Sequence, residues 1–342
     1  MDGVFMEKSS TSVPVLINFF NRPEPLKKVF GAVQKAKPQY LFLSQDGPRA
    51  GNKKDPENIE LCRQIVGDIT WDCKVFYNYS EKNLGCGKRM SSAITWAFEY
   101  VDRLMILEDD CVPSADFFSF SEVLLEKYKD DWRISMISAM NHLENYNTRD
   151  DDSYIFCNSG AIWAWATWKR EWDLYDFDMK VLRNTDWISK VKKSSYPGYY
   201  KRDLISQGRD RIRRLEAGEK LTSWTFQYNM IRFMNHQLTI VPCVNLMSNV
   251  GLTGESTHAS SSLKQLPKGL QSLFYMKARN MKFPMQHPEY VYCDDDFDRQ
   301  VWKKLGLSRP VMVYRKLEGI TRQLLYGDKG RLMKKIIQKI KR

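Results

Sequence analysis

The chain has 342 residues, of which 43% are apolar and 13% aromatic, so it can bury a full core and is not intrinsically disordered. No apolar run approaches the roughly 20 residues that a membrane-spanning helix needs. The net charge is +12 and uneven: residues 311–342 hold ten Lys or Arg against two acids, a net +8, which leaves +4 for the other 310 residues.

Seven cysteines are scattered along the chain without a CxxC pair, which favours a reducing compartment over a disulfide framework or a zinc site. The segment Met1–Ser12 is polar and has no recognisable signal peptide. We therefore expect a cytoplasmic protein.

In chain order, the first hundred residues alternate short apolar runs with helical patterns. Such alternation predicts a parallel, doubly wound α/β sheet. A polar group follows each predicted strand, and the ends of parallel strands meet at one edge of a sheet. The predicted strands are Val13–Phe20, Tyr40–Leu43, Val75–Tyr77 and Leu104–Leu107, and the polar groups after them are Arg22, Asp46, Lys88 and the acids Glu108, Asp109 and Asp110.

Three adjacent acids after a buried strand indicate a site for a divalent cation. Neighbouring carboxylates repel one another, and a hard cation such as Mg²⁺ or Mn²⁺ relieves that repulsion through oxygen ligands. The alternatives are a solvated loop with a helix-capping acid, a turn-forming role for Asp46 before Gly47, and a surface ion pair for Arg22.

These residues resemble the GT-A nucleotide-sugar glycosyltransferases, a group that includes animal N-acetylglucosaminyltransferase I and bacterial haemolysin-activation-like sugar transferases. The resemblance is carried by Phe19–Arg22, Ser44–Gly47, and Glu108–Asp110 followed by Asp116–Phe118. It covers approximately Val13–His258. It implies a GT-A-like mixed sheet flanked by helices, a UDP-sugar donor and Mn²⁺ or Mg²⁺.

The resemblance also implies roles for individual residues. Glu108, Asp109 and Asp110 would form the catalytic centre, with Asp110 binding the metal and the other two arranging the ribose and a metal-bound water. The remaining nucleotide contacts would come from Asn21, Arg22 and Asp46 near the base and from Lys88 on the diphosphate.

The chain after the acids carries an aromatic run and further strands. The predicted elements are the helix Phe117–Tyr128, the strands Trp132–Ala139, Tyr154–Asn158 and Leu238–Leu246, and the helix Leu221–Met234. The basic segment Asp186–Lys220 reads as an insertion, lid or partner surface, with a solvated helix face as the alternative.

By the resemblance, Trp163, Trp165 and Trp224 lie on the acceptor side, although core packing is the alternative for each tryptophan. Relatives often carry a catalytic carboxylate just after the equivalent of Trp224. This chain has Thr225 there, so the general base stays unassigned, and inversion and retention both stay open.

Two further groups bear on metal binding. His258 lies in a glycine-bearing loop, and the resemblance implies that it reaches the metal or the diphosphate; a structural or surface role is the alternative. The run Asp294–Asp296 could suggest a second metal site. Its position just before the predicted helix Phe297–Leu305 instead indicates a helix N-terminus.

We expect residues 1–260 to form the GT-A-like catalytic domain and residues 261–342 a helical extension. The expected function is transfer of a sugar to a glycan or lipid-linked acceptor, in bacterial surface polysaccharide or glycolipid synthesis. One alternative is a non-catalytic sugar- or membrane-binding relative. A nucleotidyltransferase is the weaker alternative, because Asn21–Glu24 lacks the glycine-rich basic loop that it would need.

The C-terminal segment Arg331–Ile340 predicts a basic amphipathic helix. Its apolar residues recur at helical spacing and lysines and arginines fill the other positions. Such a helix can lie on an anionic membrane surface, which would hold the enzyme at the inner face. The alternative is a helix docked on the body. Nucleic acid is not an expected partner, because the excess charge is confined to this tail and no binding motif accompanies it.

Overall fold

The computed structural model describes residues 10–183, 185–219, 221–252, 263–306 and 309–326. Its first part alternates strand and helix, as the sequence predicts. The elements are β1 (Val15–Phe19), α1 (Pro23–Ala36), β2 (Tyr40–Gln45), α2 (Asp55–Gly67), β3 (Lys74–Tyr79), α3 (Cys86–Ala97) and β4 (Arg103–Glu108).

The second part has shorter strands and more helices. Its strands are β5 (Cys111–Pro113), β6 (Ile134–Ser138), β7 (Tyr154–Cys157), β8 (Trp165–Trp168), β9 (Leu238–Pro242) and β10 (Met247–Asn249). Its helices are α4 (Ala115–Lys127), α5 (Lys169–Trp172), α6 (Lys180–Arg183), α7 (Trp187–Lys193), α8 (Gly198–Glu216), α9 (Thr225–Met234), η1 (Leu263–Gln265), α10 (Lys268–Gln271), α11 (Asp295–Lys304) and α12 (Arg309–Tyr326), of which η1 is a 3₁₀-helix.

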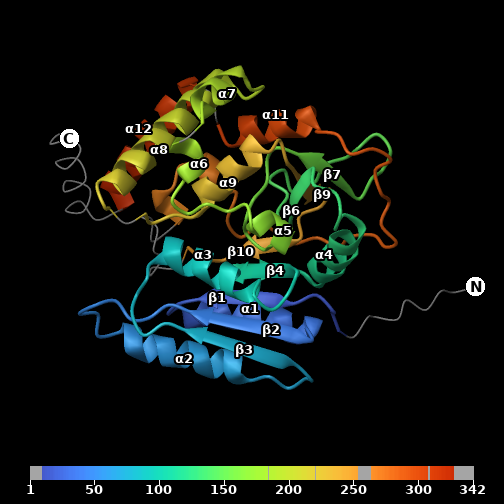
Figure 1. Ribbon diagram of the computed structural model, residues 1–342, viewed down its shortest axis with the longest axis vertical. Coiled ribbons are helices and arrows are strands. Elements are labelled where there is room, and N and C mark those ends of the chain that lie inside the picture. Colours follow the sequence, from blue (N-terminus) through green and yellow to red (C-terminus); the bar gives the residue numbers. More distant parts are fainter. Residues whose placement is uncertain (1–9, 184, 220, 253–262, 307–308, 327–342) are drawn as a thin grey trace, which may run out of the picture.

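Within the described residues, one eight-stranded sheet runs in the order β3-β2-β1-β4-β8-β6-β9-β7 (Figure 1). Strands β3, β2, β1 and β4 are mutually parallel, whereas β8 is antiparallel to both of its neighbours and β7 is antiparallel to β9. The expected GT-A-like mixed sheet with flanking helices is therefore confirmed.

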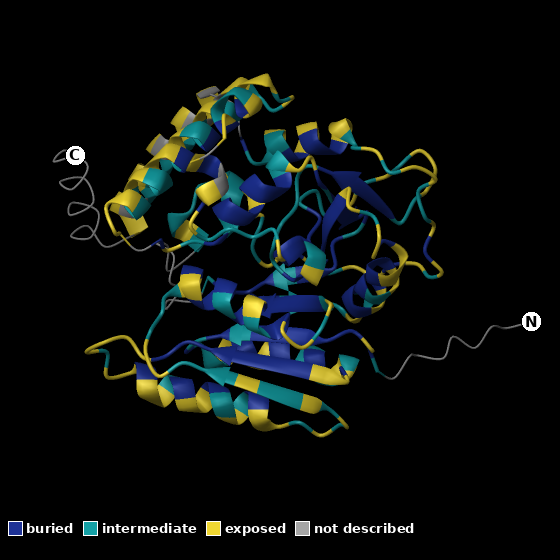
Figure 2. Ribbon diagram, viewed as in Figure 1, coloured by how far each residue is buried: buried dark blue, intermediate teal, exposed yellow. Residues whose placement is uncertain are grey.

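The central strands are mostly apolar, as expected where helices cover both faces of a sheet. Val15, Ile17 and Phe19 of β1 pack with α1 and α4, whereas Leu16 between them packs with α3 on the other face. This is the alternation that a strand imposes on successive side chains. Figure 2 shows the result: the central strands are buried and exposure is concentrated on the outer helix faces.

The sequence predicted one strand over Leu238–Leu246, but the structure has two. Strand β9 ends at Pro242, which lacks the N–H that would continue a ladder. The following strand, β10, instead pairs antiparallel with β5, directly after the three acids. The basic segment predicted as an insertion forms α7 and α8.

Part of the chain after position 262 packs against the sheet. Met276, Met281 and Met285 join the same core as β1 and α1, and Asp294 N donates to Phe156 O at 2.7 Å. The division into two domains near residue 260 stays a prediction. The predicted helix start at Asp294 is confirmed, because its side chain accepts a hydrogen bond from Phe297 N.

No helix in the described ranges combines the length and the apolar character that crossing a membrane would require.

Candidate functional site

Three parallel strands end side by side and bring the predicted polar residues together. In the register of the sheet, Asn18 of β1 lies opposite both Ser44 of β2 and Glu108 of β4. The chain leaves β1 toward Arg22 and leaves β4 toward Asp109, so these segments meet at the carboxyl edge of the sheet. The edge is thus built by pairing of segments almost 90 residues apart in sequence.

We call Glu108, Asp109 and Asp110 the carboxylate cluster, and Arg22 bridges two of its members. Arg22 Nη2 donates to Asp109 Oδ1 and, at 2.8 Å, to Asp110 Oδ2. Arg22 Nε also donates to Asp109 Oδ2 at 3.4 Å. Phe20 N donates to the same Asp109 oxygen at 3.3 Å. The alternative of a surface pair for Arg22 is wrong, because its side chain is only 13% exposed.

The electrostatics of the cluster follow from three carboxylates sharing one guanidinium. The pKa of the Glu108 carboxyl is raised to about 8, chiefly by burial and then by the charges of Asp110 and Asp109, while the charge of Arg22 lowers it. Burial likewise raises the pKa of Asp109, although Arg22 lowers it. Burial lowers the pKa of Arg22, but the two aspartates raise it more, so the guanidinium stays charged. The cluster keeps an excess of negative charge.

The strand pair β5–β10 covers the cluster from the far end of the sequence. Val250 N donates to Asp110 O at 2.9 Å, and Arg22 Nη1 donates to Gly251 O at 3.5 Å. A Cβ at Gly251 would overlap Asp110 Oδ2, so only glycine allows this close approach. Nothing in the local sequence around Gly251 indicates a contact with residues 140 positions earlier.

Asp46 organises the loop between β3 and α3. Its carboxylate accepts hydrogen bonds from Leu84 N at 2.8 Å, Gly85 N at 3.0 Å, Asn83 Nδ2 at 3.1 Å and Gly47 N at 3.0 Å. The side chain is 5% exposed. Four donors from the protein itself use most of the capacity of a carboxylate, so in this structure Asp46 shapes the loop beside the cluster.

A cavity of about 110 Å³ lies beside the cluster and contains most of the predicted nucleotide-side residues. Lys88 is not among its lining residues; it is exposed on α3, while the adjacent Arg89 is buried and lines the cavity. The cavity is lined by Asn21, Arg22, Asp46, Glu108 and Asp109 and also by residues that were not predicted as site residues, namely Asn18, Phe19, Phe20, Arg49, Asn83, Gly85 and Cys86.

A second ion pair, between the exposed Arg49 and the buried Asp55, supports the loop after β2. Asp55, at the start of α2, is fully buried and accepts from Arg49 Nη2 at 2.6 Å and from Asn21 Nδ2 at 2.8 Å. The side-chain hydrogen bond from Arg49 contributes most to keeping the pKa of Asp55 below its ordinary value, against the effect of burial. Asn21 therefore joins the β1 end to α2. In the sequence, this ion pair is indicated only by the closeness of Arg49 and Asp55, which lie six residues apart.

The donor set of the cluster fits a hard divalent cation, because it offers carboxylate oxygens with a surplus of negative charge. Within the described part of the chain, however, ligand atoms of three such residues come within 4.8 Å of one another only at Cys293, Asp295 and Asp298. Asp298 there already accepts from Asn158 N at 3.0 Å and Ser159 N at 2.8 Å. The ligand atoms of Glu108, Asp109 and Asp110 therefore do not converge on one point in this structure, and a cation at the cluster would not be held by all three acids at once.

The three tryptophans predicted on the acceptor side are not equivalent. Trp165 and Trp224 are 0% and 1% exposed, and their rings stack at 5.8 Å within the core under α9. That burial contradicts direct contact with an acceptor, because neither ring presents a face to solvent. Trp163 is partly exposed and packs 5.3 Å from Phe274, so the acceptor-side prediction rests on this residue.

His258, predicted at the metal or diphosphate, lies outside the described residues. Thr225, at the position where relatives often carry a carboxylate, starts α9, and its hydroxyl lies 3.0 Å from Ser223 Oγ. The described residues therefore supply no acid directly after Trp224, and the general base stays unassigned.

Comparisons with known proteins reach only distant likenesses. No protein-family model matches the chain, and no curated protein matches it. Among solved structures, S. aureus TarS 1-349 is 11% identical with a TM-score of 0.38, over 69% of this chain and 59% of that one. UDP-glucose pyrophosphorylase complexed with UDP-glucose is 8% identical with a TM-score of 0.28, over 48% and 78%. The chain covers less than two thirds of the TarS structure, and scores this low assign no function to it.

Proposed function

We propose that the protein is a metal-dependent glycosyltransferase that moves a sugar from a nucleoside-diphosphate donor, with UDP favoured, to a glycan or lipid-linked acceptor. The observation that carries the proposal is the carboxylate cluster at the carboxyl edge of β1, β2 and β4, beside a cavity lined by Asn21 and Asp46. Open α/β sheets bind their ligands at this edge. The surplus of negative charge there suits a cation that arrives with a diphosphate.

Each residue of the site has a defined part in this proposal. Asp110 would hold a Mn²⁺ or Mg²⁺ ion, and such an ion would supply positive charge for the departing nucleoside diphosphate. Asp109 is oriented by Phe20 N and Arg22, and the charge of a bound cation would favour the ionised form of Glu108. Asp46 keeps the Asn83–Gly85 loop against the cavity, where the base would lie.

Nucleotide binding gives the direct test. UDP with Mn²⁺ should stabilise the protein against heat, by about 2.7 kcal/mol when the ligand is at 100 times its Kd. Without Mn²⁺ the shift should be much smaller, and GDP and CMP serve as controls for base preference. If no nucleotide raises the Tm with or without Mn²⁺, the donor proposal fails.

A non-catalytic relative is the second candidate, because no carboxylate follows Trp224. Such a protein would bind UDP-sugar and Mn²⁺ without turning the donor over. Slow release of UDP from a UDP-sugar in the absence of acceptor would decide for the enzyme.

A peripheral position on an anionic membrane is the proposed setting, and α12 supports it. Two of its arginines face the body: Arg315 Nη2 donates to Lys304 O at 2.9 Å, and Arg322 Nη1 donates to Lys264 O at 3.1 Å. Its apolar side chains instead face outward, with Leu317 61% and Leu325 68% exposed. This is the reverse of a helix docked on a core.

The outward residues of α12 follow a helical spacing and form one apolar stripe: Val313, Tyr314, Leu317, Ile320, Leu324 and Leu325. The basic residues of 329–342, whose predicted helix lies outside the described residues, come directly after it in sequence. An apolar stripe beside a positively charged segment suits an anionic bilayer. A second copy of the chain fits less well, because two such tails would repel.

Vesicle co-sedimentation tests the membrane proposal. The intact protein should sediment with phosphatidylglycerol vesicles, less so at high salt, and deletion of Lys329–Arg342 should abolish this while sparing nucleotide binding. Leu317→Glu with Leu324→Glu should also weaken it. Leu61→Glu with Val123→Glu is the matched control, since these exposed residues lie on α2 and α4. Sedimentation of the truncated chain at the wild-type level would contradict the role of the tail.

A further inference from the structure

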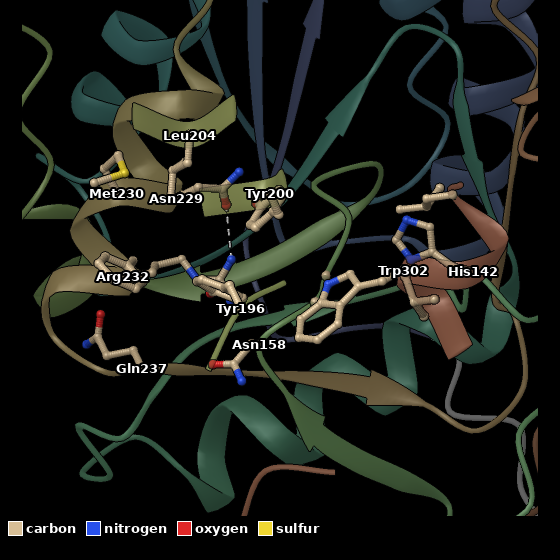
Figure 3. Close-up of a pocket in the computed structure, with 15 residues that line it drawn as sticks. His142, Asn158, Tyr196, Tyr200, Leu204, Asn229, Met230, Arg232, Gln237 and Trp302 are labelled. Carbon is tan, nitrogen blue, oxygen red and sulfur yellow. Dashed lines mark hydrogen bonds between the residues drawn. The ribbon is translucent and has the colours of Figure 1, made fainter. Parts of the chain in front are cut away.

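A second cavity lies over the half of the sheet formed by β6, β9 and β7, and is lined by α8, α9 and α11 (Figure 3). Its volume is about 280 Å³, and it continues into a neighbouring cavity of about 380 Å³. The two share Asn158, Tyr196, Arg232, Phe233 and Gln237. We call the pair the α9 cavity. It has no lining residue in common with the cavity at the carboxylate cluster.

Arg232 is a buried cation whose hydrogen-bond partners are neutral. Its side chain is 4% exposed, and it donates to Ser135 Oγ at 2.6 Å, to Asn229 Oδ1 at 3.2 Å and to Thr239 Oγ1. Among the described residues, no carboxylate forms an ion pair with it. Three of its five N–H groups are thus used, and none is used by an anion.

The buried carboxylates of this region are engaged elsewhere. Glu171 pairs with Arg170 and accepts from Gln237 Nε2; the charge of Arg232 lowers the pKa of Glu171, but these two residues form no ion pair. Asp298 accepts the backbone N–H groups of Asn158 and Ser159. A buried charge is normally matched by a charged partner with good hydrogen-bond geometry. Arg232 lies at the wall of a cavity and has hydrogen-bond partners there, but it has no ion-pair partner among the described residues.

Other polar groups of the same cavity lack partners. Of the eight buried side-chain polar atoms without a hydrogen bond in the described chain, three belong to residues that line it: His142 Nδ1, Ser159 Oγ and Gln237 Oε1. Gln237 is 4% exposed, and burial lowers the pKa of His142 to about 4, so its imidazole is neutral. Buried polar atoms in native proteins are usually satisfied, so these await a ligand or water.

The remaining lining includes aliphatic side chains such as Leu204, Met230 and Leu305, together with aromatic rings and two lysines. Tyr196 lies 5.1 Å from Tyr200 and 5.7 Å from Trp302, measured between ring centroids. Lys190 and Lys193 of α7 line the neighbouring part, and both are exposed. No Asp or Glu side chain lines either part of the α9 cavity, as far as the described residues go.

We propose that the α9 cavity is a second ligand site, which binds a small organic anion carrying a phosphate or carboxylate group on a hydroxylated body. The anionic group lies against Arg232, with Lys190 and Lys193 attracting it from the entrance. The amide of Gln237 and the imidazole of His142 form hydrogen bonds with hydroxyl groups of the ligand. This assignment does not depend on the proposed transferase activity, because the two cavities are separate.

Titration calorimetry on the full chain tests the site, with glucose 1-phosphate and glucuronate as probes and glucose as the neutral control. At least one anion should bind, while glucose should not. Comparison of the glucose 1-phosphate and glucuronate titrations shows whether the site binds a phosphate or a carboxylate group. Lys190→Gln with Lys193→Gln should weaken binding about fivefold, since each exposed charge contributes modestly.

Lys192→Gln is the matched control, because Lys192 is an exposed lysine of α7 that does not line the cavity. It should leave probe affinity unchanged, as should Asp110→Asn, which alters the carboxylate cluster alone. Arg232→Gln should abolish binding, with its Tm measured to confirm folding. If that variant does not fold, the lysine pair decides.

Three results would overturn the site. The first is that neither anion binds the wild-type chain. The second is that glucose binds as tightly as the anions. The third is that Asp110→Asn removes probe binding, which would move the probe to the carboxylate cluster. Loss of UDP binding in the Mn²⁺ experiment would instead affect the transferase proposal only.

Discussion

Asp110→Asn should reduce Mn²⁺-dependent UDP binding by about 100-fold, because it removes the carboxylate that holds the cation while keeping the shape of the side chain. Asp110 has three hydrogen-bond partners. Its carboxylate accepts from Arg22 at 2.8 Å and from Cys111 Sγ at 3.3 Å, and its backbone oxygen accepts from Val250 N. The amide keeps the size of the original group, so the fold should survive. Calorimetric titration of UDP with and without Mn²⁺ gives the readout.

Asp130→Asn is the control for this experiment, since Asp130 is an exposed acid away from the sheet edge. It should bind UDP and Mn²⁺ as the wild type does. Asp110→Ala should have the same effect on binding as Asp110→Asn. Turnover at the wild-type level in either Asp110 variant would remove the cluster from the proposed mechanism.

Arg22→Ala should lower the free energy of unfolding of the metal-free protein by about 3 kcal/mol at pH 8, since it leaves buried carboxylates without their counter-charge. Arg22 is the only described guanidinium in contact with both Asp109 and Asp110. Denaturant unfolding in the presence of a chelator measures the loss. Saturating Mn²⁺ should restore part of it, because the cation takes over the neutralising role.

The stability lost in Arg22→Ala should be smaller at lower pH, because the folded and unfolded states bind different numbers of protons. The pKa of Glu108 is raised from 4.5 to about 8 in the folded chain, so the folded state binds more protons than the unfolded state between these values. Stability therefore falls as pH rises through that window. Arg22 lowers the pKa of Glu108 and Asp109, so its removal steepens the fall.

Arg133→Ala provides the matched control. Arg133 is 62% exposed in its pair with Asp131, so its loss should change stability by no more than about 1 kcal/mol and without the same pH dependence. A deficit for Arg22→Ala that is equal at pH 5 and pH 8 would show that packing, not charge, is what Arg22 contributes.

The sequence by itself was sufficient for the parallel half of the sheet and for the place of the site. Runs such as Leu104–Leu107 are apolar throughout because helices cover both faces of the sheet, and that pattern is local. The acids after β4 and Arg22 after β1 could then be placed at one edge, because parallel strands end together. The helix start at Asp294 was equally local, since it depends on one side chain and the next turn.

The tertiary structure decided what these residues do to one another. From the sequence, Asp46 could form a turn or contact a nucleotide. In the structure its carboxylate accepts a hydrogen bond from Asn83, 37 residues later. Trp163 and Trp165 are two positions apart, yet Trp165 begins β8 and is fully buried, whereas Trp163 precedes the strand and is partly exposed. The close approach of Gly251 to Asp110 likewise depends on the tertiary structure, because the two residues are far apart in the sequence.

The α9 cavity could not have been predicted from any stretch of the chain. Its lining comes from positions 142 to 305, and none of these residues indicates a ligand site when read alone. Local periodicity determines which face of a helix or strand is buried. Whether Arg232 then meets a carboxylate or an open cavity depends on how α8, α9 and α11 pack over the sheet, because burial and charge matching are properties of contacts between distant segments.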